Sequence, residues 1–127
     1  ETKHSENFNK NIKEIEEKYL PHKKYDDVDI YARGRFWMKQ RHIVESPFYY
    51  IDYTLAQVVA FQFFNEDRKN HEKAWKKYVR LCKLGGKYPF TELLEHAHLN
   101  NPFVDGTVSK TVKPLKKYLE SIDDSKY

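Results

Sequence analysis

The sequence predicts an all-α fold, with five or six helices in a single domain over residues 1–127. Apolar residues recur three and four positions apart in most segments, which is the spacing of one helix face. No segment shows the alternation of apolar and polar residues that is typical of a strand. The chain holds only four glycines and five prolines, and most of them separate the periodic segments.

The first expected helix runs from Ser5 to Leu20 and is followed by a loop. Ser5 can cap the first turn, and Pro21 ends the helix. The loop from Pro21 to Arg35 is polar and contains Gly34, so we expect one short helical turn in it at most. The apolar face of the helix consists of Phe8, Ile12, Ile15 and Tyr19.

A buried central helix is expected at about 47–65, after a helical stretch from Arg35 to Glu45. Ser46 and Pro47 provide an N-cap followed by proline at the first helical position. Apolar side chains occupy nearly every side of this helix, which is typical of a buried element. They are Phe48, Ile51, Leu55, Val58, Val59, Phe61 and Phe63.

Three more helices are expected toward the C-terminus. Residues 68–84 form the first, which ends at Gly85 and Gly86; its expected core face consists of Trp75, Tyr78, Val79 and Cys82. A short helix follows Pro89. The last helix carries Pro114 near its first turn or at a bend, and its apolar stripe consists of Val108, Val112, Leu115, Leu119 and Ile122.

Charge and composition narrow the classes of function. The net charge is only +4, and the basic face of residues 68–87 has no interleaved aromatic residue on which bases could stack. We therefore expect a solvated surface and no nucleic-acid partner. One cysteine and no apolar run long enough for a bilayer indicate a soluble, cytoplasmic protein without a membrane partner. The chain begins with Glu1 and its only methionine is Met38, so we expect a piece of a longer polypeptide.

No metal site is expected from the residues of this chain. His96 and His98 are two positions apart, which points them about 200° apart on a helix, whereas ligands on one helix face are three or four apart. The chain also lacks an HExxH motif. Cys82 lies on an expected core face, so we interpret it as a structural thiol.

Four polar side chains are the candidate site: His42, Tyr49, Tyr50 and Tyr53. The tyrosines share neighbouring faces of one helix, and a turn at residues 46–47 could bring His42 over them. In one interpretation, the tyrosines are ordinary core residues with their hydroxyls bonded to the backbone. In the other, a phenol and an imidazole converge to donate hydrogen bonds to a developing oxyanion. Composition alone favours the first interpretation.

A resemblance to a known family favours the second. The string GRFWMKQRHIVESPFYYIDYTLAQVVAFQFF resembles the C-terminal part of the oligoendopeptidase F type of zinc peptidases, which are relatives of thimet oligopeptidase. The similarity continues through WKKYVRLCKLGGKYPFTELL and LNNPFVDGTVSKTVKPLKKYL, and so covers about Tyr25 to Leu119. The resemblance implies the helical catalytic domain of a cytoplasmic metalloendopeptidase that cleaves short peptides.

The same resemblance implies roles for the four side chains. His42 matches a catalytic histidine that contacts substrate near the scissile bond, and Tyr53 matches the tyrosine that stabilises the oxyanion. Tyr49 or Tyr50 matches a second, substrate-binding tyrosine. The family's zinc ligands and general base are absent here, so we expect zinc only in the parent enzyme and an inactive isolated chain.

The expected partners are oligopeptide substrates and the N-terminal remainder of the same enzyme. The alternative hypothesis is a stand-alone, non-catalytic helical module that binds peptides or a partner protein. In an isolated piece, the tyrosine-bearing face of the central helix is expected to be exposed, which predicts an apolar patch or self-association.

Overall fold

The computed structural model describes residues 3–25, 27–123 and 125. These residues form helices joined by turns and loops, without a β-strand among them, which confirms the all-α prediction. Backbone contacts divide the chain into two compact units, Glu1–Tyr50 and Ile51–Tyr127. The expectation of a single domain over 1–127 stays a prediction.

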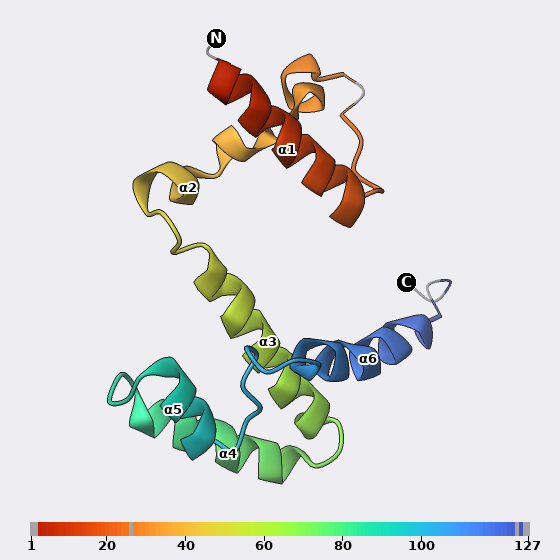
Figure 1. Cartoon of the computed structure of the whole chain (residues 1–127). Helices are drawn as coiled ribbons and strands as arrows, with labels where there is room; N and C mark the ends of the chain where they lie inside the picture. The colour runs from red at the N-terminus through yellow and green to blue at the C-terminus, as the bar shows by residue number, and fades with distance from the viewer. Residues whose placement is uncertain (1–2, 26, 124, 126–127) are drawn as a thin grey trace. The chain divides into compact units, whose positions relative to one another are not determined.

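The first unit consists of α1 (Lys3–Tyr19), a π-helical turn η1 (Tyr31–Arg35), a 3₁₀ turn η2 (Phe36–Lys39) and α2 (Arg41–Glu45). The segment that contains η1 packs against α1 (Figure 1). Ser5 lies inside α1 and so is not the predicted cap. The stretch from Arg35 to Glu45, expected to be helical, is interrupted at Gln40, whose ψ of 87° is not helical.

A glycine and an asparagine allow η1 to lie directly on α1. Gly34 has a φ of 78°, and a Cβ at this position would collide with the backbone carbonyl of Asn9. Asn9 is buried, and its Oδ1 accepts a hydrogen bond of 2.9 Å from Trp37 Nε1. The Trp37 ring also packs edge-on against Phe8, with centroids 4.9 Å apart. A close backbone approach and one buried polar pair therefore join the two segments.

The first unit also contains an aromatic cluster with a lysine beside it. The rings of Tyr25, Tyr31 and Phe36 lie 5.4–5.8 Å from one another. Lys23 Nζ stands 3.3 Å from the Phe36 ring centroid, a cation–π contact, and 3.4 Å from Glu16 Oε1. Burial lowers the pKa of Lys23, but the hydrogen bonds and charges of Tyr25 and Glu16 outweigh it, so the pKa is raised.

The second unit consists of α3 (Ile51–Asp67), α4 (His71–Leu84), α5 (Phe90–His96) and α6 (Thr107–Glu120). Both α4 and α6 pack on α3 (Figure 1). The core of the unit consists of Leu94, Ala97 and Leu99, with Val59 and Phe63 of α3 among the residues packed against it. Asn70 caps α4 by accepting a hydrogen bond of 2.9 Å from the backbone N–H of Lys73.

The central helix differs from its prediction in two ways. It begins at Ile51 rather than at Pro47, because Phe48 has a φ of 70°, which no α-helix accommodates. It is also not buried all round: among its described residues only Val58 and Gln62 are buried, while Ile51 and Tyr53 are exposed. The remaining apolar side chains of α3 are exposed because α4 and α6 cover only part of the surface of this helix.

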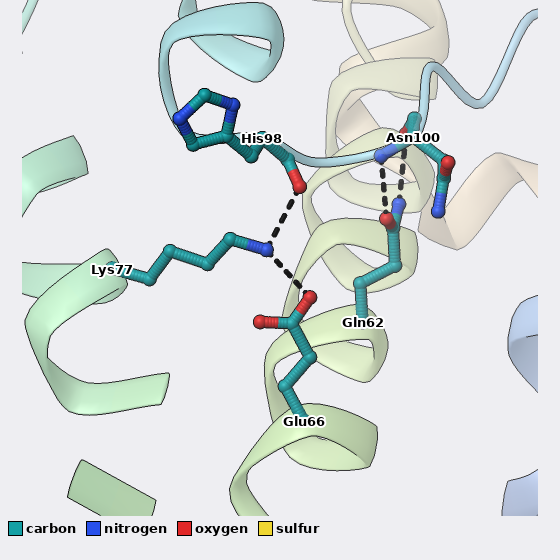
Figure 2. A network of polar contacts seen from close by, with 5 residues as sticks. All are labelled: Gln62, Glu66, Lys77, His98 and Asn100. Carbon is teal, nitrogen blue, oxygen red and sulfur yellow. Dashed lines mark hydrogen bonds and ion pairs between the residues drawn. The ribbon is translucent and has the colours of Figure 1, made fainter. Parts of the chain in front are cut away.

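A polar network ties the loop after α5 to the helices beneath it (Figure 2). Gln62 Nε2 donates to Asn100 O at 2.9 Å, and Asn100 N donates back to Gln62 Oε1 at 2.8 Å. Lys77 Nζ bonds Glu66 Oε1 at 2.6 Å and His98 O at 2.8 Å. These bonds satisfy polar groups that the chain buries beside its core.

The expected core face of α4 was wrong. Trp75 and Cys82 are exposed, and Ala74 is the residue that the helix buries. The Tyr78 ring, although 45% exposed, still packs edge-on against Phe63 of α3, with ring centroids 5.6 Å apart. Within the described ranges, none of the helices is both long and apolar enough to cross a bilayer.

Candidate functional site

A turn between α2 and the second unit shapes the first part of the candidate site. Ser46 N bonds the His42 carbonyl at 3.1 Å, and Tyr49 N bonds the Ser46 carbonyl at 3.1 Å. Between them, Phe48 takes a left-handed backbone conformation and leaves its ring 94% exposed. A bulky residue in that conformation is strained, and such strain is concentrated at functional sites.

This turn brings three of the four predicted side chains together. The His42 ring lies 5.2 Å from the Tyr50 ring and 6.4 Å from the Tyr49 ring, the latter nearly parallel at 26°. His42 is half-buried, whereas Tyr49 and Tyr50 are exposed. The tyrosines are therefore not core residues in this chain, contrary to the interpretation that composition favoured.

Tyr53, the fourth predicted side chain, belongs to the second unit. It lies in the first turn of α3, next to Asp52. The negative charge of a carboxylate at this position interacts favourably with the helix dipole. The Tyr53 ring is 54% exposed. The convergence of Tyr53 with His42 stays a prediction, as does the choice between Tyr49 and Tyr50.

The helix that carries Tyr53 is anchored to the rest of its unit by residues closer to its C-terminus. Val58 and Gln62, which follow Tyr53 by five and nine residues, are the buried residues of α3, and Gln62 makes the paired hydrogen bonds with Asn100 (Figure 2). Sequence reasoning did not single out Gln62. The signal was present, because an amide within an apolar run requires partners when it is buried.

The chemistry open to these groups is neutral hydrogen-bond donation. Phenol and imidazole side chains can donate to an oxygen on which negative charge develops. No cluster of three or more His, Cys, Asp or Glu side chains that could hold a metal ion occurs among residues 3–25, 27–123 and 125. His96 lies against the Tyr88 ring instead, with centroids 4.4 Å apart.

Solved structures of peptidases resemble this chain. An X-ray structure of a protein assigned as oligoendopeptidase F is 50% identical, with a TM-score of 0.84 over 91% of this chain and 20% of its own. PZ peptidase A, in a structure with an inhibitor, is 50% identical, with a TM-score of 0.82 over 88% of this chain and 20% of its own. An assigned oligoendopeptidase F from Bacillus anthracis str. Ames is 35% identical, with a TM-score of 0.62 over 94% of this chain and 22% of its own.

The fold is therefore that of a portion of a larger peptidase. More particularly, the chain belongs to the oligoendopeptidase F type, which confirms the predicted resemblance. It spans about a fifth of the length of the solved chains that it matches. The sequence matches no family model and no curated protein.

Proposed function

We propose that this chain is the C-terminal part of a zinc metalloendopeptidase that hydrolyses short peptides in the cytoplasm. The observation that carries the proposal is the 50% identity to an assigned oligoendopeptidase F over 91% of the chain, with a TM-score of 0.84. The identity to PZ peptidase A, solved with an inhibitor, supports it independently. The partners would be oligopeptides and the remainder of the same polypeptide.

In this proposal, the chain supplies one wall of the substrate cleft. Tyr53 donates a hydrogen bond from its hydroxyl to the carbonyl oxygen as charge develops there, and His42 contacts the peptide beside the scissile bond. Tyr49 or Tyr50 binds substrate. The exposure of all three tyrosines supports these roles, because a donor must be reachable by a ligand.

Within the part of the chain that the structure describes, the residues do not fit a zinc site. The described residues contain no group of side chains suited to a metal ion, so the proposal assigns the zinc ligands to the rest of the parent enzyme. The isolated chain would then bind no catalytic zinc and hydrolyse no peptide. Peptide hydrolysis by the isolated chain that a chelator abolishes would contradict this division of roles.

The substitution Tyr53→Phe in the parent enzyme tests the catalytic role. It removes one hydroxyl, and we expect kcat to fall by about 10²–10³-fold with little change in KM, because the lost bond forms in the transition state. Tyr78→Phe is the matched control, since Tyr78 is a half-exposed tyrosine on α4, outside the candidate site. An unchanged kcat in Tyr53→Phe would refute the oxyanion role.

A further inference from the structure

The apolar stripe of α6 is left largely uncovered by the part of the chain that the structure describes. The stripe consists of Val108, Val112, Leu115 and Leu119, which share one face of the helix. Leu119 is 64% exposed, and Val108 and Val112 are also exposed. The residues of α6 that the chain buries are two polar ones, Thr107 and Thr111. The amphipathic pattern of this helix is therefore not satisfied within the chain.

A specific hydrogen bond fixes this orientation. Asn65 Nδ2 on α3 donates to the backbone carbonyl of Thr111 at 2.8 Å. At the same crossing, the Tyr118 ring lies 5.6 Å from the Phe64 ring, and the Arg68 guanidinium stands 3.7 Å from the Tyr118 ring centroid. Rotating α6 to bury its apolar stripe would break these contacts, so the stripe remains available to a partner.

Three residues of the stripe, Val112, Leu115 and Leu119, line a groove between α3 and α6. Its volume is about 730 Å³, and its walls are mostly apolar, with Phe61 and Phe64 on one side and Leu115 and Leu119 on the other. Lys116 and Glu120 form an exposed ion pair of 3.7 Å at its rim. An apolar floor with a charged rim is the form of site into which an amphipathic helix binds.

We propose that the groove between α3 and α6 is the docking site for an amphipathic helix from the rest of the parent peptidase. This inference rests on the proposed function. The solved oligoendopeptidase F chain that shares this fold at a TM-score of 0.84 is about five times as long as the matched portion, since that portion covers 20% of it. A helix in the same polypeptide meets the groove at a high effective concentration, which favours it over a second copy of the chain.

Thiol labelling at two positions of α6 tests the proposal in the parent enzyme. Leu119→Cys places a thiol in the groove, and Lys117→Cys places a matched thiol on the exposed side of the same helix. We expect the thiol at position 119 to react roughly ten-fold or more slowly, because reaction would require local opening of the docked helix. Mass spectrometry of proteolytic peptides reads each position separately from Cys82. Equal rates at the two positions in the parent would overturn the proposal.

The isolated 127-residue chain completes the test. Both thiols should react at similar rates in it, because positions 117 and 119 are both exposed there. Protection of position 119 that grows with chain concentration would identify a second copy as the occupant and overturn the proposal. The labelling is independent of catalysis. Slow labelling in a parent that hydrolyses no peptide would sustain the docking site while refuting the proposed function.

Discussion

Different interactions stabilise the interior of each of the two units of the chain. The second unit contains all five buried hydrophobic residues of the described chain: Val58, Ala74, Leu94, Ala97 and Leu99. The first unit buries Asn9 and Gly34 instead. It is held by a close backbone approach, one buried hydrogen bond and an aromatic cluster.

The residues of the candidate site are divided between these two differently stabilised units. His42, Tyr49 and Tyr50 belong to the unit without a buried apolar residue, and Tyr53 belongs to the unit with a hydrophobic core. Burial of apolar surface is the main source of stability, at about 25 cal/mol for each Å². We therefore expect the first unit to open more readily, and substrate-contacting segments are commonly drawn from such regions.

The largest expected effect is from Leu94→Ala in the core of the second unit. Leu94 is 2% exposed, and removing its side chain should lower the free energy of unfolding by about 2–5 kcal/mol. The rate of backbone hydrogen exchange in the 127-residue chain should rise in α5 and in the C-terminal half of α3. Leu119→Ala is the control, since Leu119 is exposed. Equal effects of the two substitutions would show that no core exists at Leu94.

The next largest effect is expected from Gly34→Ala, which disrupts the close contact between η1 and α1 in the first unit. A side chain at this position would meet the Asn9 carbonyl in a left-handed backbone conformation, at a cost of about 1–3 kcal/mol. Faster exchange should be confined to α1 and residues 31–39, while α5 is unchanged. Gly86→Ala is the control, because nothing lies within 4 Å of a Cβ there. Loss of protection in both units would disprove their separation.

The smallest effect is a pH dependence of the first unit. The pKa of Lys23 is raised in the folded chain, so its contribution to stability is complete below the unfolded value of about 10.5 and is lost as the pH rises through the folded value. Trp37 fluorescence in a Trp75→Phe background can follow urea unfolding of this unit. The midpoint should fall at alkaline pH, and it should fall less in Lys23→Met. An equal fall of the unfolding midpoint with and without the Lys23→Met substitution would show that Lys23 is not the cause.

The positions of the helices were largely predictable from the sequence. Gly85 follows α4 and Pro89 precedes α5, as expected, because capping groups and proline act on the nearest turn of backbone. The expected start of α4 at residue 68 was three residues early, since Asn70 caps a helix that begins at His71. The start of α3 was missed. Ser46 and Pro47 have the pattern of a helix start, but the left-handed backbone at Phe48 ends that local preference.

The residues of the candidate site were named from the sequence, and their roles stay a prediction. Spacing and resemblance named His42, Tyr49, Tyr50 and Tyr53, and in the structure the His42 ring lies beside the rings of Tyr49 and Tyr50. That these tyrosines are exposed did not follow from composition, because an aromatic ring suits a core and a binding surface equally well.

Local spacing in the chain decided that it is helical, where most helices end and which side chains share a face, because these depend on backbone geometry and neighbouring residues. Which face is covered was decided only by tertiary contacts. On α4, the small Ala74 is buried in place of Trp75. On α6, Asn65 donates a hydrogen bond to the Thr111 carbonyl, Thr111 is buried, and most of the apolar stripe is left uncovered. Periodicity identifies an apolar face but not its partner, since that partner can lie elsewhere in a longer polypeptide.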